Sequence, residues 1–339
     1  MRILVMGGTW FLGKSVVDGA LRRGWEVTTF NRGRSGRDAP GTEAVHGDRT
    51  SREDLQQLAV QGPWDAVIDT SSSELPPRDV RLAAQALRDR AARWVHISTV
   101  SVYAGWPHRT LTEDATLLDC PPDADETHGH TGADGSPTKY GFQKAGGERA
   151  IAESFDDRAV FLRPGVILGP GEYVGRLPWW LNRAHRGGRI LAPAPAERCI
   201  QPVDVRDVAA FALDQAAVSD SGAYNIAHPE GISFGDFLEA CLTSTEGAGR
   251  PVWVSPEVLA EYRVKQWTEL PLWRTHDGVW SVDSSRAVAA GLTCRPLRET
   301  INDTSAWLRA DGRPVDHTRW ADHGIDPDKE AKILASFAS

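Results

Sequence analysis

Several features are scarce in this chain of 339 residues. It has only four cysteines, at positions 120, 199, 241 and 294, and none of them forms a C-x-x-C pair. The sequence therefore indicates neither a zinc site nor a disulfide framework. No apolar run approaches the length that spans a bilayer, and the N-terminal apolar stretch is interrupted by glycines. We expect a cytoplasmic protein that does not associate with a membrane.

The chain also lacks an excess of positive charge, because its 46 Asp and Glu residues outnumber its 38 Lys and Arg residues and give a formal net charge of −8 at pH 7. A protein that binds RNA or DNA needs a basic surface, so we expect no nucleic acid as a partner. Hydrophobic residues (41%) and charged residues (25%) have the proportions of a soluble globular protein. The length is sufficient for one large α/β domain with a smaller lobe.

The first thirteen residues, MRILVMGGTWFLG, carry the most informative pattern. An apolar run over residues 3–6 predicts a buried strand, and a helix is expected between the glycine turn that follows and Gly24. Backbone N–H groups and the helix dipole at such a turn bind the pyrophosphate of a dinucleotide. Trp10 replaces the middle glycine of G-x-x-G-x-x-G, so the pattern alone also fits an ordinary strand–turn–helix unit. The predicted cofactor contacts in this turn are Gly7, Thr9, Trp10, Phe11, Leu12 and Gly13.

Strand and helix patterns then alternate along the chain. This alternation predicts an α/β fold with a doubly wound parallel sheet of the Rossmann type. We expect a cofactor domain over residues 1–170, with strands that return near 201–228, an interleaved substrate lobe over 171–309 and a tail over 310–339. Further strands are expected at 26–30, 45–48, 64–70, 93–99, 159–163 and 223–227, and helices at 78–90, 176–189, 208–217, 233–243 and 303–308.

The end of the second strand is where such a fold distinguishes two cofactors. A carboxylate there binds the ribose 2′-hydroxyl of NAD(H), whereas arginine accommodates the 2′-phosphate of NADP(H). Asn31 is neutral, and Arg32 and Arg34 follow it, so the sequence favours NADP(H) over NAD(H). The alternative is that both arginines are merely solvated. Asp48 and Thr70, at the ends of later strands, are further predicted cofactor contacts.

Thr99, Tyr140 and Lys144 form the predicted catalytic set. Tyr140 and Lys144 are four residues apart and therefore share one helix face, while Thr99 ends a strand. A tyrosine has a pKa of about 10, and an ammonium about 4 Å away contributes about 4 kcal/mol toward its ionisation. We expect Lys144 to activate Tyr140 and to contact the cofactor ribose, with Thr99 holding the substrate oxygen.

Five motifs together resemble the extended short-chain dehydrogenase/reductase superfamily, also called NAD-dependent epimerase/dehydratase. They are GGTWFLG at 7–13, STVSVY at 98–103, YGFQK at 140–144, RPG and GPG at 163–171, and VDVRDV at 203–208. The GGTxFLG form resembles a branch of bacterial reductases related to chloroplast stem-loop-binding proteins. The resemblance implies that Thr99 is the family's Ser/Thr and that Tyr103 is not the catalytic tyrosine.

The resemblance has further implications and limits. It adds Arg163 to the predicted cofactor contacts, and it places Arg176, Trp179 and Arg206 near the substrate, where each is equally compatible with a structural ion pair or a core aromatic residue. Val100 and Ser101 replace the Asp-Glu pair of nucleotide-sugar 4,6-dehydratases, which argues against that reaction. Residues 102–138 are rich in Pro, Asp and Gly and are expected to form a substrate lid or a disordered segment. Two histidines there are not expected to bind a metal.

These observations favour an NADP(H)-dependent oxidoreductase that acts on a ketone or secondary alcohol of a small polar, sugar-like or secondary-metabolite substrate. Two alternatives remain open at this point. One is an epimerase that retains its nicotinamide cofactor, and the other is a catalytically silent RNA-binding or regulatory relative. A homodimer is compatible with all three.

Overall fold

The structure is a computed structural model that describes residues 1–34, 36–132, 135–310, 312 and 317–337. Seven parallel strands form its central sheet, in the spatial order β11-β6-β5-β4-β1-β2-β3. This order is that of a Rossmann sheet with one added strand, so the predicted fold class is confirmed. The strands are β1 (Arg2–Met6), β2 (Glu26–Asn31), β3 (Glu43–His46), β4 (Ala66–Asp69), β5 (Trp94–Ile97), β6 (Ala159–Pro164) and β11 (Gly222–Ile226).

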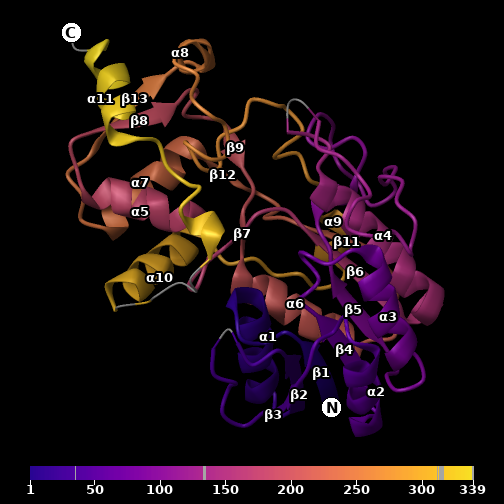
Figure 1. The fold of residues 1–339 in the computed structure, drawn as a ribbon. Coiled ribbons are helices and arrows are strands. Elements are labelled where there is room, and N and C mark those ends of the chain that lie inside the picture. The colour runs from indigo at the N-terminus through magenta and orange to yellow at the C-terminus, as the bar shows by residue number, and fades with distance from the viewer. Residues whose placement is uncertain (35, 133–134, 311, 313–316, 338–339) are drawn as a thin grey trace.

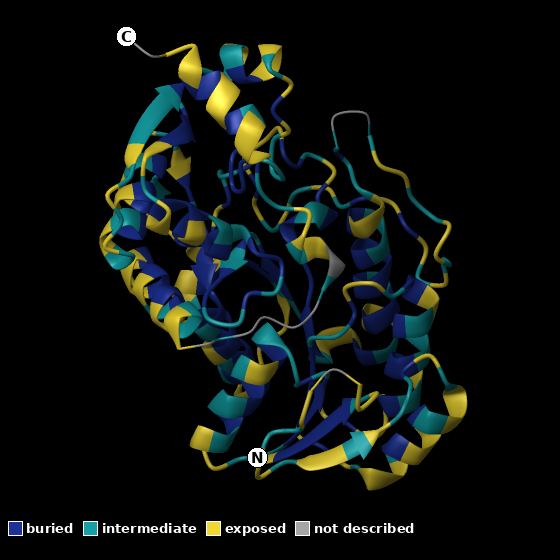
Figure 2. Ribbon diagram, turned by 60° about the vertical axis from the view of Figure 1, so that its left-hand side comes forward, coloured by how far each residue is buried: buried dark blue, intermediate teal, exposed yellow. Residues whose placement is uncertain are grey.

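Helices cover both faces of the sheet (Figure 1). One face carries α1 (Phe11–Arg22) and α6 (Val205–Ala217), which contact each other. The other face carries α2 (Arg52–Gln61), α3 (Pro77–Leu87) and α4 (Lys139–Phe155). Because both faces are covered, the central strands are apolar and buried, whereas the edge strand β3 is largely exposed (Figure 2).

A second part of the chain forms the lobe, which packs around Trp180, Phe234 and Phe237. The helix expected at 176–189 ends earlier, at His185, because Gly187 and Gly188 adopt positive φ angles. The helices of the lobe are α5 (Arg176–His185), α7 (Phe234–Ser244), α8 (Pro256–Glu261), α10 (Leu297–Arg309) and α11 (Pro327–Ala335), while α9 (Ser285–Ala289) packs on β11. Its strand pairs are β8 (Arg189–Pro193) with β13 (Arg250–Val254), and β9 (Cys199–Ile200) with β12 (Ile232–Ser233); β7 (Ile167–Leu168) and β10 (Val203–Asp204) pair at its border with the sheet.

The described part of the segment 102–138 is largely a packed loop. Trp106, Leu111 and Leu118 are buried in one apolar cluster, together with residues from the lobe side of the chain. Leu111 pairs with Val282, which ties this loop to a distant part of the sequence. Positions 133 and 134 lie outside the described residues, so the structure does not address the tip of the predicted lid.

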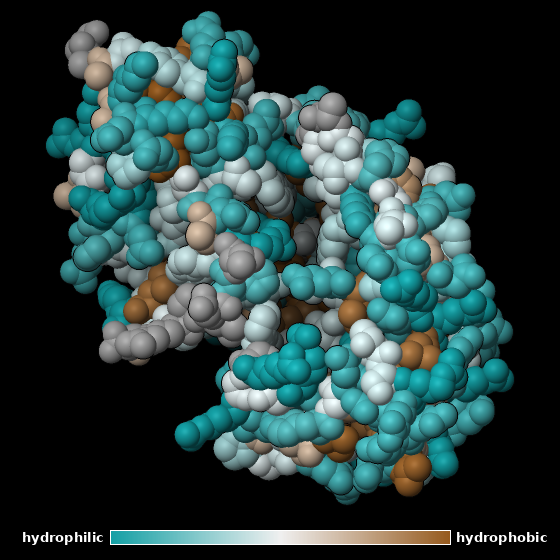
Figure 3. All heavy atoms as spheres, in the orientation of Figure 1, coloured by the Kyte–Doolittle hydropathy of each residue, from teal (hydrophilic) through white to brown (hydrophobic). Residues whose placement is uncertain are grey.

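The C-terminal segment is an integral part of the lobe. Arg183 of α5 donates to both carboxylate oxygens of Glu330 on α11, at 2.8 and 2.9 Å, and both side chains are buried. The 3₁₀ turn η3 (Thr318–Trp320) lies between the lobe and the sheet, beside the N-terminal end of α1 (Figure 1). The surface is hollowed between the sheet and the lobe, and we call this hollow the cleft (Figure 3). Among the described helices, none combines the length and apolar character needed to cross a membrane.

Candidate active site

The glycine turn after β1 has the geometry of an anion cradle. Gly7 and Gly8 have φ angles of +107° and +103°, which side chains rarely adopt. A Cβ atom on Gly7 or on Gly13 would lie 2.7 Å from Thr70 Oγ1, so both positions require glycine. The N-cap residue of α1, Trp10, makes no side-chain capping hydrogen bond, so its side chain does not occupy the N–H groups of the first turn. These features fit the pyrophosphate of a dinucleotide.

Trp10, the departure from the glycine pattern, belongs to an aromatic cluster. Its ring centroid lies 5.6 Å from that of Tyr173 and 5.8 Å from that of His317, and Phe11 contacts Tyr173 at 6.2 Å. Leu12 is buried in the core between α1 and the sheet, so only its backbone is available to a cofactor. The aromatic cluster joins the glycine turn to the lobe and to the C-terminal segment.

The end of β2 carries a carboxylate that the sequence analysis missed. Asp38 accepts a hydrogen bond from Asn31 Nδ2 at 2.8 Å and lies 2.8 Å from His46 Nε2. Burial raises its pKa, but the hydrogen bonds with His46 and Asn31 outweigh this and leave the pKa of Asp38 below its usual value. No local pattern marks Asp38, because a loop brings it back to Asn31 from seven residues further along the chain.

Arg32 and Arg34 lie on the same rim and are exposed. Hydrogen bonds from Thr50 hold the pKa of Asp48 below its usual value, and the charges of Arg32 and Arg34 lower it further. The structure therefore brings together the two arginines and Asp48, which the sequence had placed near the adenosine. Their contact with a cofactor stays a prediction.

Thr99 and Tyr140 meet at the carboxyl edge of the sheet. Thr99 follows β5, Tyr140 lies in the first turn of α4, and their side chains are close enough for a hydrogen bond that lowers the pKa of the phenol. Tyr140 is 39% exposed, yet protein surrounds it on several sides, as expected for a residue that lines a cleft. Desolvation and the neighbouring Tyr173 raise its pKa to about 12, against the opposing effects of Thr99, Arg319 and Arg176. The phenol is therefore protonated at neutral pH.

Lys144 has buried hydrogen-bond partners that the sequence did not predict, and its predicted contact with Tyr140 and the cofactor stays a prediction. Its Nζ donates to Ser72 Oγ at 2.9 Å and to the carbonyl of Ile97 at 2.6 Å, and the residue is only 4% exposed. Burial lowers the pKa of Lys144 to about 8. Tyr140 lies in the first turn of α4, whereas Lys144 is one turn further on and is turned toward the buried end of β5. The cations that act most strongly on the phenol are Arg319 and Arg176, which the sequence did not associate with it.

Lys144 lies near a buried network of charged side chains, formed by Arg49, Asp69 and His96. Arg49 donates to both oxygens of Asp69, at 2.7 and 3.1 Å, and His96 Nδ1 lies 3.3 Å from the same carboxylate. Although desolvation opposes it, the charge of Arg49 together with the hydrogen bond from His96 holds the pKa of Asp69 well below its usual range. The sequence signal was present, because Asp69 is a charged residue that closes an otherwise apolar strand.

Arg163 forms a second buried ion pair. Its Nε and Nη2 donate to the two oxygens of Glu148 at 2.9 and 2.6 Å, and its Nη1 donates to the hydroxyl of Tyr103 at 2.9 Å. All five N–H groups of an arginine are on these three nitrogens, and each nitrogen donates to one of these partners. This is the geometry of a structural ion pair, and a cofactor contact by Arg163 stays a prediction.

The three residues that the resemblance placed near the substrate have different environments. Arg206 forms ion pairs with Asp204 and Asp303 at 2.8 and 2.6 Å. Trp179 packs edge-on against the neighbouring tryptophan, with ring centroids 4.6 Å apart. Arg176, in contrast, makes no side-chain hydrogen bond to any residue that the structure describes.

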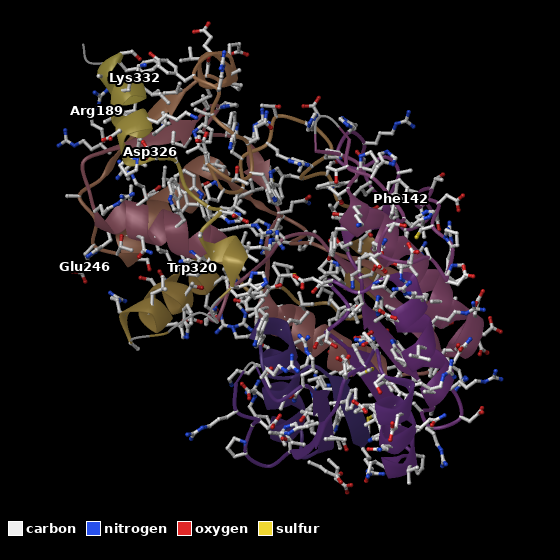
Figure 4. The ribbon with its side chains drawn as sticks, viewed as in Figure 1. Phe142, Arg189, Glu246, Trp320, Asp326 and Lys332 are labelled. Carbon is white, nitrogen blue, oxygen red and sulfur yellow. The ribbon has the colours of Figure 1, made fainter. Side chains whose placement is uncertain are left out.

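The two histidines of the 102–138 loop contact an aromatic ring. His128 and His130 lie 6.2 and 5.0 Å from the ring centroid of Phe142, which projects from α4 (Figure 4). Within the described ranges, no group of three or more His, Cys, Asp or Glu side chains is placed to hold a metal ion.

A parallel seven-stranded sheet, a glycine cradle and a Thr–Tyr pair at the carboxyl edge define a dinucleotide-binding protein of the Rossmann class. The chain belongs to the NAD dependent epimerase/dehydratase family, whose model matches residues 3–227. The predicted superfamily is thereby confirmed, and membership supports a nicotinamide dinucleotide as cofactor. The relationship to the branch with chloroplast stem-loop-binding proteins stays a prediction.

Solved structures show the same fold at low sequence identity. The enzyme WbmH of Bordetella bronchiseptica, in complex with NAD+, has a TM-score of 0.70 at 19% identity, over 92% of this chain and 99% of that chain. WbmG of the same organism, in complex with NAD and UDP, has a TM-score of 0.70 at 19% identity, over 93% and 96%. The UDP-glucose 4-epimerase of Thermus thermophilus, in complex with NAD, has a TM-score of 0.65 at 19% identity, over 91% and 99%. No curated protein matches the chain.

Proposed function

We propose that this protein is an NADP(H)-dependent oxidoreductase that interconverts a ketone and a secondary alcohol on a small polar substrate. The observation that carries the proposal is the meeting of Thr99 and Tyr140 at the edge of the cleft, on the side of the sheet where the glycine cradle lies. In folds of this class ligands bind outside the carboxyl ends of the strands. A bound nicotinamide would supply or accept the hydride.

The protonation state of Tyr140 suits the reductive direction. With a pKa of about 12 the phenol keeps its proton at neutral pH and can donate it to the substrate oxygen. Thr99 would hold that oxygen in place by a hydrogen bond. The oxidative direction requires the phenol to lose its proton, so we expect the rate of oxidation to rise with pH. Lys144 uses two of its three N–H donors on Ser72 and Ile97, which leaves one for a cofactor hydroxyl.

Tyr140→Phe tests this proposal. The variant lacks the proton donor but keeps the ring, so we expect turnover of a carbonyl substrate to fall by about 10² to 10⁴. Tyr262→Phe, a half-buried tyrosine of the lobe, is the matched control and should leave turnover unchanged. Full turnover by Tyr140→Phe would sink the proposal, because the variant has no phenol at the position that shares a hydrogen bond with Thr99.

The preference for NADP(H) is supported by the exposed Arg32 and Arg34, which lie near Asp48. Asp38 opposes it, because a carboxylate at the end of β2 attracts a ribose hydroxyl and repels a phosphate. We therefore expect NADPH to bind only about tenfold more tightly than NADH, which corresponds to about 1.4 kcal/mol. Calorimetric titration of wild type and of the Arg32→Ala/Arg34→Ala variant measures this. Equal affinities in the wild type would contradict the preference.

A cofactor-retaining epimerase is the second candidate, and the aromatic cluster favours it. Trp10, which precedes the first turn of α1, contacts the rings of Tyr173 and His317, and we expect this cluster beside the glycine cradle to slow the escape of a bound dinucleotide. Purified protein that carries nicotinamide and does not exchange it with added NADPH would support an epimerase. Free exchange would support the oxidoreductase.

A further inference from the structure

Arg176, at the start of α5, is a nearly buried cation without a hydrogen-bonded partner. Its side chain is 13% exposed, and its Nε atom is inaccessible and unpaired. The nearest carboxylate oxygen, Oε1 of Glu172, lies 3.7 Å from Nη1, which is beyond hydrogen-bond distance. Burial lowers the pKa of Arg176, which indicates that the site disfavours the bare charge. Buried charges in proteins normally have hydrogen-bonded partners, so this guanidinium requires an explanation.

Glu172 does not provide that partner, because its carboxylate caps the helix. Its two oxygens accept hydrogen bonds from the backbone N–H groups of Arg176 and Leu177, at 3.0 and 3.1 Å. A carboxylate in this position satisfies the helix end and its dipole. The guanidinium of Arg176 also lies over the ring of Trp267, 5.6 Å from its centroid, so its described contacts are this cation–π contact and the 3.7 Å ion pair with Glu172.

A second cation, Arg319, lies on the same wall of the cleft. It is exposed and forms no ion pair with the described part of the chain. Its segment is fixed on both sides, because the ring of His317 lies 4.9 Å from that of Tyr173, and a Cβ atom on Gly175 would lie 3.2 Å from Trp320 Cε3. Trp320 marks this segment at the edge of the lobe that borders the cleft (Figure 4).

Both arginines act on the same groups. Burial raises the pKa of Tyr140 and of Tyr173, and the charges of Arg319 and Arg176 oppose this rise. Burial lowers the pKa of Arg176, the charge of Glu172 opposes this shift, and the charge of Arg319 adds to it. Two like charges that repel each other beside a proton donor are an arrangement that an anion would stabilise.

We propose that Arg176 and Arg319 bind an anionic group of the substrate, a phosphate or a carboxylate, close to the carbon atom on which Tyr140 acts. Guanidinium groups present paired N–H donors that match the oxygens of such groups. The inference rests on the proposed function only for the role of Tyr140. Arg319 lies outside residues 3–227, so the family match does not assign it. The substrate class is thereby narrowed to small anionic carbonyl compounds or alcohols.

The diphosphate of the dinucleotide is the other source of the same chemistry, and calorimetry can separate the two. Inorganic phosphate and malonate are titrated into the full-length protein, alone and with saturating NADPH. We expect saturable binding of at least one anion, unchanged by NADPH. Arg176→Gln and Arg319→Gln should each weaken it at least tenfold. Arg186→Gln is the control, since this exposed arginine follows the opposite end of α5.

Three results would overturn the inference. They are no saturable binding in the wild type, unchanged binding in the Arg319→Gln variant, and loss of binding when NADPH is present, which would assign the anion to the cofactor. Arg319 is exposed, so its variant decides the question even if Arg176→Gln does not fold. Tyr140→Phe should bind the anion normally, so full turnover in that variant would end the proposed function without affecting the arginine site. If no dinucleotide binds, the titration without NADPH still decides the arginine site.

Discussion

Two sets of charged side chains lie within reach of Tyr140, and they differ in how their charges are satisfied. Beneath the sheet edge, Arg163 is held by two hydrogen bonds to Glu148 at 2.9 and 2.6 Å, and the network around Asp69 has a similar form. On the lobe side of the cleft, Arg176 has a 3.7 Å ion pair with Glu172 but no hydrogen bond to described side chains, and Arg319 has no ion pair within the described part of the chain. The first set stabilises the fold, whereas the second has the features of a ligand site.

Glu148→Gln should give the largest loss of stability, because it leaves Arg163 buried beside a neutral partner. Breaking a buried ion pair on one side typically costs about 3–5 kcal/mol. The free energy of unfolding, measured by urea titration, should fall by that amount. Glu153→Gln is the matched control on the same helix, since its ion pair with Arg81 is at the surface and should cost less than about 1 kcal/mol. Equal losses in the two variants would remove the structural role that we assign to the first set.

Lys144→Met tests whether the buried charge of Lys144 destabilises the fold, because this effect on the free energy of unfolding depends on pH. The pKa of Lys144 is about 8 in the folded protein, below 10.5 for the free side chain, so burial of the charged amine destabilises the fold below pH 8. This penalty disappears as the pH rises from about 8 to 10.5. Relative to the variant, the wild type should therefore gain roughly 3 kcal/mol across this window.

Urea titrations at pH 7.5, 9 and 10.5 measure this change. Only the difference between wild type and variant is interpreted, because other groups also titrate. Lys332→Met, on the exposed side of α11, is the control for exchanging a lysine for methionine at the surface (Figure 4). A constant difference for Lys144→Met would contradict the burial of its charge.

Arg176→Gln should have the smallest effect on stability. Its guanidinium makes no hydrogen bond with described groups that the substitution would break, so the free energy of unfolding should change by less than about 1 kcal/mol in either direction. Thermal and urea unfolding check this beside Glu148→Gln. A loss of 3 kcal/mol or more would place Arg176 with the structural charges and erase the contrast between the two sets.

Much of the fold could be read from local patterns. The apolar run before Gly7 and the regular alternation of strand and helix patterns that follows predict the sheet. Strands that are buried on both faces must consist mainly of apolar residues, so they are easy to recognise in the sequence. Residues 303–308, expected to belong to a last helix, lie in α10, whose start at Leu297 was not predicted because polar residues on its exposed face hide its first turns from a search for apolar spacing. The packing of residues 102–138 was also hidden, since it depends on Leu111 meeting Val282.

The candidate site likewise contains residues that could be predicted from the sequence and residues that could not. Thr99 and Tyr140 were accessible to sequence reasoning because each lies in a motif, and the motif fixes the element on which the residue lies. Asp38 and Arg319 were not, because loops bring them to the site from positions without any periodic signal. The partners of Lys144 were not accessible either, since the spacing of a helix fixes a face but not the groups that lie opposite it, and its predicted role beside Tyr140 stays a prediction.

The sequence by itself determined the Rossmann sheet and the glycine turn, and it singled out Tyr140 as the candidate proton donor, because these depend on short-range spacing and on backbone conformations that only certain residues allow. Only the tertiary structure decided which charged side chains have hydrogen-bonded partners. A guanidinium acts as a structural group or as part of a ligand site according to the acceptors within about 3 Å of it, and those acceptors come from distant parts of the chain.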